Sequence, residues 1–311
     1  MAETTTSRLL SERLHRACPV CGSTDQSHVF ATESLDFEAL GDHAFASRKR
    51  PERMRLHLVE CPVCDLVYAD SPPAPEALAS LYEDAAFSSA EEAGFAARTY
   101  ADAVEPLAQR LPDRDGALDI GTGEGAFMVE LQRLGFTGVA GIEPSVEPIA
   151  AAPDSVRALI QQGVFEAGLH PADSLSLITC FQTIEHVPDP MAMVRDALEM
   201  LKPGGMLVIV CHDRRSFVNR TLKLRSPIMD VEHMQLFSPT SITQLLSRGG
   251  LTGVGRDVIR NKYPARYWAQ LLPLPGALHR GFEGALAKSG LGARPVTLNV
   301  GNQLAWGTKP R

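Results

Sequence analysis

The feature that most constrains the fold is a glycine-rich turn between two short apolar segments. Residues 117–120 are largely apolar and lead into Gly121, Gly123 and Gly125, and a second apolar segment ends at Glu143. Glycines allow the backbone to adopt positive φ and to approach a ligand closely. A helix that begins after such a turn presents unpaired N–H groups and the positive end of its dipole. The pattern therefore predicts a strand–turn–helix unit that binds a nucleotide-like ligand.

Strand-length apolar segments and helical segments alternate from Gly116 onward. Residues 206–211 form a continuous apolar run, residues 175–180 are mostly apolar, and residues 191–201 between them have helical spacing. Apolar strands separated by helices are typical of a parallel sheet that is covered on both faces. We therefore predict an α/β fold with a Rossmann-like, doubly wound, mostly parallel sheet.

Two cofactor classes use a glycine turn followed by an acidic strand end. The segment Gly121–Ala126 has the Gly-x-Gly-x-x-Ala form of a dinucleotide site, and Glu143 has the spacing of a group that binds ribose hydroxyls. Asp119 and Glu124 flank the turn, however, and carboxylates are unfavourable beside a pyrophosphate. They are favourable beside a sulfonium-bearing amino acid, whose ammonium and sulfur are both positive. We favour the sulfonium ligand and keep an NAD-type oxidoreductase as the alternative.

Between about residues 100 and 255, the chain resembles the class I S-adenosylmethionine-dependent methyltransferases. The resemblance rests on ordered motifs at Asp119–Gly125, Ile142–Ser145, Gln162–Phe165, Phe181–Pro190 and Leu201–Leu207. It implies a seven-stranded sheet with S-adenosylmethionine as the cofactor. The cofactor-binding residues that it implies are Asp119, Gly121, Thr122, Gly123, Gly125, Glu143, Pro144, Val164, Phe165, Phe181 and Gln182.

Four of the six cysteines form two Cys-Pro-Val-Cys knuckles, at Cys18 and Cys21 and at Cys61 and Cys64. A knuckle directs both thiolates towards one centre, and two knuckles supply the four ligands of tetrahedral zinc. A redox role for Cys-x-x-Cys requires a strand–helix context, which neither pair has. The pattern predicts a small N-terminal module with structural Zn²⁺; free thiols or a redox pair are the alternatives.

A zinc module followed by such a domain is similar to the sugar C-methyltransferases and their relatives in natural-product and polysaccharide biosynthesis. The resemblance implies O- or C-methylation of a small-molecule acceptor. Glu232 and His233 resemble the acid–histidine pair proposed for base chemistry in those enzymes, and His186 follows a strand at the ligand-binding edge. These three residues are the catalytic candidates. Both histidines have an alternative role in organising their loops.

The composition restricts the partners. The net charge of −7 does not favour binding to a nucleic acid backbone. The sequence contains no apolar run of membrane-spanning length, so we expect a cytoplasmic protein with a small-molecule acceptor, and a macromolecular acceptor is the alternative. Basic residues at 214–225 suit either a solvated loop or an acidic acceptor.

The expected organisation is a flexible tail (1–14), a zinc-binding module (15–70), a linker with helices (71–109), the cofactor-binding domain (110–255) and a C-terminal extension that could pack on the acceptor site (256–311).

Overall fold

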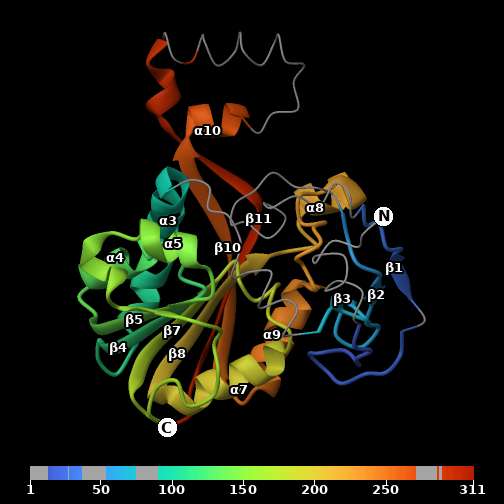
Figure 1. Ribbon diagram of the computed structural model, residues 1–311, viewed down its shortest axis with the longest axis horizontal. Coiled ribbons are helices and arrows are strands. Elements are labelled where there is room, and N and C mark those ends of the chain that lie inside the picture. The colour runs from blue at the N-terminus through green and yellow to red at the C-terminus, as the bar shows by residue number, and fades with distance from the viewer. Residues whose placement is uncertain (1–12, 27, 37–53, 75–89, 271–285, 287–288) are drawn as a thin grey trace.

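The computed structural model describes residues 13–26, 28–36, 54–74, 90–270, 286 and 289–311, which form two sheets (Figure 1). Most of the expected tail (1–12) and part of the expected linker (75–89) lie outside the described residues. The described residues of the tail, 13 and 14, contact the start of the expected linker: the Leu14 amide donates to the Pro72 carbonyl at 3.0 Å.

The larger sheet has seven strands in the order β10-β11-β8-β7-β4-β5-β6. The five strands β8, β7, β4, β5 and β6 are parallel to one another. Beyond β8, strands β11 and β10 extend the sheet by antiparallel pairing. This confirms the predicted α/β fold with a mostly parallel, seven-stranded sheet. In chain order, the strands are β4 (Asp115–Ile120), β5 (Thr137–Glu143), β6 (Ile160–Gln162), β7 (Leu175–Phe181), β8 (Leu201–His212), β10 (Thr252–Pro264) and β11 (Pro295–Thr308).

Helices cover both faces of this sheet, with α3 and α4 on one side and α7 and α9 on the other (Figure 1). Alternate side chains of β8 show the two faces: Val208 and Val210 pack with α3 and α4, whereas Ile209 and Cys211 pack with α7 and α9. Burial on both faces explains why the central strands are mostly apolar along their length. The helices are α3 (Ala90–Ala108), α4 (Ala126–Arg133), α5 (Val146–Ala151), α6 (Asp154–Arg157), α7 (Pro190–Met200), α8 (Phe217–Leu222), α9 (Pro239–Arg248) and α10 (Ala265–Gln270), with short 3₁₀ turns at η1 (Lys223–Arg225) and η2 (Leu291–Ala293).

Local sequence signals set the starts of α7 and α9. The Asp189 carboxylate accepts from the amides of Met191 and Ala192 at 3.0 Å, and Pro190 occupies the first turn of α7. Ser238 and Ser241 form a reciprocal capping box at the start of α9. Such caps satisfy amides that have no partner within the helix.

The last two strands are part of the main sheet. β10 crosses the boundary expected at residue 255, and β11 pairs directly with β8 through Asn302 and His212. Residues 256–264 and 295–308, which were expected to belong to a C-terminal extension, thus complete the seven-stranded sheet. No helix in the described part of the chain is both long enough and apolar enough to cross a membrane.

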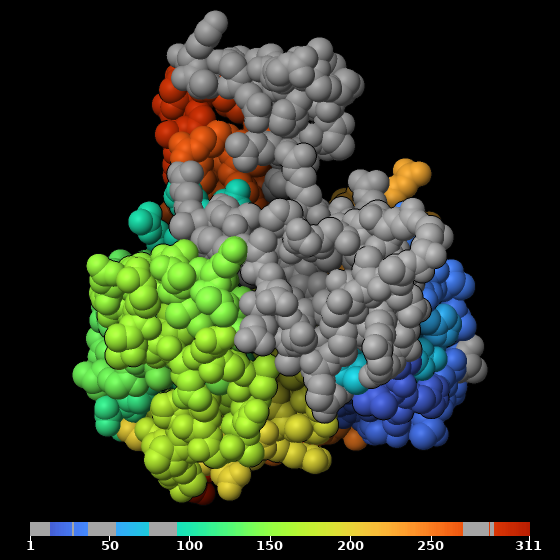
Figure 2. Space-filling model, viewed as in Figure 1, coloured from blue at the N-terminus to red at the C-terminus, as the bar shows by residue number. Residues whose placement is uncertain are grey.

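The smaller sheet belongs to the N-terminal module and has the order β1-β2-β3-β9. Figure 2 shows this module, in blue, at one side of the molecule. Its first three strands are β1 (Val29–Ala31), β2 (Leu58–Glu60) and β3 (Val67–Ala69), whereas β9 (Gln235–Leu236) comes from the segment that follows β8 in the chain. The two parts of the chain thus share one small sheet.

The basic segment after β8 divides into two parts. The Arg214 side chain is buried and forms ion pairs with Glu60, at 2.6 Å, and with Asp65 of the module. Arg215 binds the same two carboxylates. The remaining residues, Arg220, Lys223 and Arg225, are exposed. Part of the expected solvated loop is therefore a contact between the module and the main sheet.

Candidate functional site

The glycine turn after β4 is built so that only glycine fits. Gly121, Gly123 and Gly125 have φ values of 69°, 56° and 73°, a region that other residues rarely adopt. A Cβ atom on Gly121 would lie 2.3 Å from the Thr183 Oγ1. The turn leads directly into α4, whose first amides face the space beyond the strand ends.

Two buried carboxylates flank this turn. Asp119 Oδ1 accepts from Thr179 Oγ1 at 2.6 Å, and its Oδ2 accepts from Thr122 Oγ1 at 2.8 Å. Glu143, the last residue of β5, accepts from the backbone amides of Gly123 and Ser145, both at 2.9 Å. Asp119 and Glu143 are only 3% and 6% exposed, respectively, and no basic side chain of the described residues forms an ion pair with either of them.

The buried position makes the charged form of these carboxylates costly. Burial raises the pKa of Asp119 to about 6, because the hydroxyl groups of Thr179 and Thr122 offset the desolvation only in part and Glu143 adds repulsion. Burial also raises the pKa of Glu143, although the hydrogen bonds from the amides of Ser145 and Gly123 act in the opposite direction. A cationic ligand at this position would relieve both effects.

The other residues implied for the cofactor surround the same edge. Phe181, at the end of β7, packs edge-on between Tyr100 and Phe127, with ring centroids 4.9 and 4.7 Å away. Gln182 follows with φ of 54°, and its buried Nε2 has no hydrogen-bond partner among the described residues. An amide donor that is buried without a partner is a group that a ligand can satisfy.

The residues implied for the adenine side follow β6, which pairs with β5. Gly163 joins the end of β6 to Glu143 by donating to its carbonyl at 3.0 Å. Val164 is 46% exposed, whereas Phe165 is partly buried against the main core. Pro144 lies between Glu143 and α5. The structure therefore places all the implied cofactor residues at the carboxyl edge of β4, β5, β6 and β7.

Three histidines meet beyond the ends of β7 and β8. The ring centroids of His186 and His233 lie 4.8 Å apart, and those of His212 and His233 lie 5.4 Å apart. Glu232 Oε2 is 3.4 Å from His186 Nδ1. The structure thus brings together the three predicted catalytic candidates, His186, Glu232 and His233.

Sequence reasoning missed His212, the last residue of β8. Its backbone amide donates to Glu185 Oε1 at 2.7 Å, and its Nδ1 lies 2.9 Å from Asn302 Oδ1 on β11. Its position could have identified it from the sequence, because β8 runs parallel to β7 and ends at the same edge of the sheet. The pairing with Asn302 could not be inferred, since β11 is distant in the sequence.

Hydrogen bonds set the protonation pattern of these rings. His233 Nδ1 lies 2.9 Å from the Ile228 carbonyl, which can only accept, so this nitrogen carries the proton. Asn302 donates through its Nδ2 to Asn261, so its Oδ1 accepts from His212 Nδ1. Burial also lowers the pKa of His212, which favours the neutral ring. In the neutral form, Nε2 of His212 and of His233 keeps a lone pair that can accept a proton.

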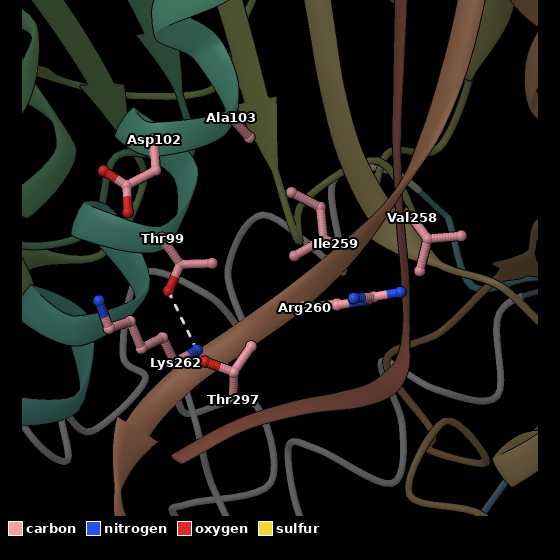
Figure 3. A pocket seen from close by; sticks show the side chains of 8 residues that line it. All are labelled: Thr99, Asp102, Ala103, Val258, Ile259, Arg260, Lys262 and Thr297. Atoms are coloured by element: carbon pink, nitrogen blue, oxygen red, sulfur yellow. Dashed lines mark hydrogen bonds between the residues drawn. The ribbon is translucent and has the colours of Figure 1, made fainter. Parts of the chain in front are cut away.

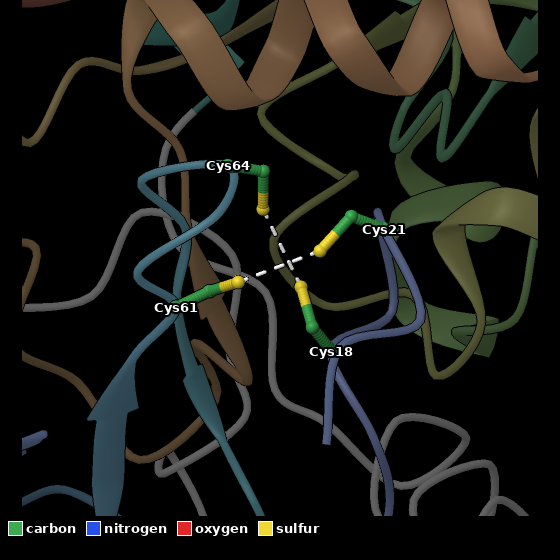
Figure 4. Close-up of side chains that lie close together, drawn as sticks. All are labelled: Cys18, Cys21, Cys61 and Cys64. Atoms are coloured by element: carbon green, nitrogen blue, oxygen red, sulfur yellow. Dashed lines mark hydrogen bonds between the residues drawn. The ribbon is translucent and has the colours of Figure 1, made fainter. Parts of the chain in front are cut away.

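The four cysteines of the module point at a common centre (Figure 4). Their Sγ atoms all lie within 4.8 Å of one another, and the Cys18–Cys64 and Cys21–Cys61 separations are both 3.4 Å. Four thiolates around one zinc ion stand about 3.8 Å apart, as follows from a Zn–S length of about 2.3 Å in a tetrahedron. The histidine group does not satisfy this metal-site geometry among the described residues, whereas the cysteine group does.

The two knuckles have the same backbone pattern. In each, the carbonyl of the first cysteine accepts a hydrogen bond from the backbone amide four residues later, which belongs to Gly22 or Asp65. Both of these residues have positive φ. This repeated turn explains why a glycine and an aspartate follow the second cysteines, because few other residues tolerate that conformation.

Figure 3 shows a separate surface pocket of about 290 Å³ between α3, β10 and β11. None of the residues predicted from the sequence to form the site lines it. The lining residues are Thr99, Asp102, Ala103, Val258, Ile259, Arg260, Lys262 and Thr297.

Comparison with known proteins gives one family and several distant relatives. Residues 93–255 match a family model described as a methyltransferase domain. The ubiquinone biosynthesis O-methyltransferase of Actinobacillus pleuropneumoniae is 33% identical over 116 residues, 34% of this chain and 47% of that protein. The enzyme of the same name from Cronobacter sakazakii is 34% identical over 96 residues, 28% of this chain and 38% of that protein. The chain therefore spans less than half the length of these curated relatives.

Solved structures with a similar arrangement have lower sequence identity. A protein from Thermotoga maritima, described as an S-adenosylmethionine-dependent methyltransferase and possible histamine N-methyltransferase, is 21% identical with a TM-score of 0.47, over 70% of this chain and 90% of that chain. The geranyl diphosphate C-methyltransferase of Streptomyces coelicolor is 14% identical with a TM-score of 0.45, over 68% and 78% of the two chains.

The raised pKa of Asp119 predicts a pH-dependent contribution to stability. The folded state binds this proton more tightly than the unfolded chain, so the contribution is full below about pH 4 and is lost as the pH rises through about 6. Between about pH 5 and pH 8, the unfolding free energy of the wild type should fall by about 1.4 kcal/mol relative to that of Asp119→Asn. Denaturant titrations of the ligand-free proteins across this range measure the difference, and a constant difference would contradict the prediction.

Proposed function

The chain belongs to the methyltransferase-domain family that its residues 93–255 match, and from that membership we propose that it transfers a methyl group from S-adenosylmethionine to a small-molecule acceptor. The observation that carries the proposal is the pair of buried carboxylates, Asp119 and Glu143, on the two sides of the glycine turn. Both have raised pKa values and no cationic partner among the described residues, so the site favours a positively charged ligand.

The residues present fit this cofactor in charge and in their common placement at one edge of the sheet. Asp119 and the turn at Gly121, Thr122, Gly123 and Gly125 would hold the cationic methionine portion, and Glu143 with Pro144 would hold the ribose. Val164 and Phe165 would lie beside the adenine, and Phe181 and Gln182 beside the sulfur. The Gln182 Nε2, which has no partner in the described part of the chain, supports a polar ligand at this edge. A pyrophosphate would instead place negative charge beside two buried carboxylates, so the oxidoreductase alternative is not retained.

When bound, S-adenosylmethionine supplies a methyl group on a positively charged sulfur, open to in-line displacement by a nucleophile. The chain's own residues must then orient the acceptor, exclude water and accept its proton. The Nε2 of His233 is the proposed base: it accepts the proton as the acceptor oxygen or carbon forms its bond to the methyl carbon. Glu232 and His186 stand beside it, and the Glu232 carboxylate offsets the positive charge that develops on the histidines.

The acceptor class follows from the histidines and from the relatives. An imidazole removes a proton most effectively from a group of moderate acidity, such as a phenolic hydroxyl or an activated carbon acid. The curated relatives are named as O-methyltransferases. We therefore propose O- or C-methylation in a biosynthetic pathway, with oxygen as the favoured atom.

For the cysteine module we propose one structural zinc ion, bound by Cys18, Cys21, Cys61 and Cys64. The support is the approach of the four sulfur atoms and the matched turns of the two knuckles. Four sulfur ligands leave no open coordination position, so such an ion would stabilise the module and would not contact the acceptor.

Calorimetric titration with S-adenosylhomocysteine tests the cofactor. The wild type should bind it, and Glu143→Gln should weaken binding about tenfold to a hundredfold, because a charged hydrogen-bond acceptor for the ribose is lost. Glu147→Gln, an exposed neighbour on α5, is the matched control and should bind normally. Absence of binding by the wild type, or stabilisation by NAD alone, would refute the proposal.

His233→Gln tests the base. Loss of the proton acceptor should lower the rate of methyl transfer by a factor of about 10² to 10⁴, while the affinity for S-adenosylhomocysteine stays within about twofold. Transfer of labelled methyl to a panel of phenolic acceptors provides the rate, and His28→Gln, an exposed histidine of the module, serves as the control. An undiminished rate in the His233 variant would remove this residue from the mechanism.

Elemental analysis tests the metal. The purified wild type should contain about one zinc ion per chain, and Cys61→Ser should lose most of it, because the tetrahedral site needs all four thiolates. Cys211→Ser replaces a buried thiol outside the cluster and should keep the metal. A metal-free wild type would contradict the assignment.

A further inference from the structure

The segment that carries His233 is held by the N-terminal module. Its continuation, β9, pairs with β3 through Leu236 opposite Val67 and Gln235 opposite Tyr68. The Ala69 amide also donates to the Met234 carbonyl at 2.8 Å. β9 pairs with no strand of the seven-stranded sheet. The backbone position immediately after His233 is therefore set by the module.

Apolar burial strengthens this attachment. The side chains of Ile228, Met229, Val231, Met234 and Leu236 form one buried cluster with the module, where their partners include Leu56, Leu58, Val67 and Ala69. Burial of such apolar side chains away from water favours the attached arrangement. The segment before and after Glu232 and His233 is thus anchored on both sides.

Arg16 joins the module to both histidine segments. Its Nε donates to the Ala69 carbonyl at 2.9 Å, and its Nη1 donates to the Pro188 carbonyl at 2.7 Å. Its Nη2 donates to the Met234 carbonyl and to Gln235 Oε1, both at 3.0 Å. One planar guanidinium therefore links three segments, one of them two residues beyond His186 and another immediately after His233. Burial lowers the pKa of Arg16 to about 10, so the side chain remains charged at neutral pH.

Gln235 completes the connection from the other side. Its side chain is fully buried, with Oε1 facing Arg16 and Nε2 donating to the carbonyls of Ile184 and Val187 at 2.8 and 2.7 Å. These two carbonyls flank His186 in the chain. The Met234 amide adds a further bond to the Glu185 carbonyl at 3.0 Å. Arg16 and Gln235 thus fix the backbone around His186 against the backbone after His233.

We propose that Arg16 and Gln235 are positioning residues of the acceptor site, through which the cysteine module sets the placement of His186 relative to His233. The inference rests on the proposed function for its chemical meaning, because the two rings, 4.8 Å apart, belong to the proposed proton-accepting group. Displacement of a reacting group by about 1 Å can cost about a hundredfold in rate. The cofactor residues on β4 and β5 make none of these contacts. Loosening this connection therefore affects the acceptor side and leaves cofactor binding intact.

Arg16→Gln is the first test, with Arg16→Lys as the conservative variant and Arg13→Gln as the matched control. Arg13 lies just before the module, and its side chain donates to the Ser71 carbonyl and to Glu33. Hydrogen exchange at the amides of Ala69 and Met234 should accelerate about tenfold to a hundredfold in Arg16→Gln, because a charged hydrogen bond to this backbone is lost. Arg16→Lys should recover part of the protection, and Arg13→Gln should match the wild type.

A second readout reports on the histidines themselves. The ring ¹⁵N signals of His186 and His233 should move in Arg16→Gln, while the metal content of the module and the affinity for S-adenosylhomocysteine stay as in the wild type. Unchanged ring signals and unchanged exchange in a folded Arg16→Gln variant would overturn the inference. Failure of the wild type to bind S-adenosylhomocysteine would refute the proposed function, whereas the exchange and ring measurements would still decide the role of Arg16.

Discussion

The candidate site depends on one geometric constraint, the parallel direction of β4, β5, β7 and β8. Parallel strands end at the same edge of a sheet, so residues far apart in the chain are delivered to one place. Asp119 and Glu143 stand at the ends of two such strands, and Phe181 and His212 stand at the ends of the other two. Because these strands are buried on both faces, none of them can shift without disturbing both cores. The cofactor side of the site is therefore rigid.

The acceptor side is assembled differently. His186 and His233 lie on segments outside the sheet, and their placement depends on buried polar contacts rather than on strand pairing within the large sheet. Gln235 and Arg16 satisfy several buried carbonyls in that region, each of which would be costly without a partner. The same bonds that meet this requirement hold the two histidines together. The same hydrogen bonds thus contribute to the stability of this region and fix the relative placement of the two histidines.

The parts of the molecule that local sequence dictates could be predicted, and the parts that depend on distant pairing could not. The turn at Gly121–Gly125 needs glycine for its backbone, and the continuous apolar strands need two covered faces, so both were evident from the sequence. His212 was missed because its partner Asn302 lies on β11, which no local pattern connects to β8. The burial of Arg214 was missed for the same reason, since its partners Glu60 and Asp65 belong to the module.

The shared small sheet has a consequence for the order in which the protein folds during synthesis. The first three strands of this sheet leave the ribosome early, but the fourth, β9, follows Val67 only after about 170 further residues. Contacts between such distant segments require closure of a long loop, and they form late. Until then, the apolar face of the module that later receives Met229, Val231 and Met234 stays uncovered. While the central strands are being synthesised, the nascent chain therefore exposes an apolar surface of the N-terminal sheet that the finished protein buries.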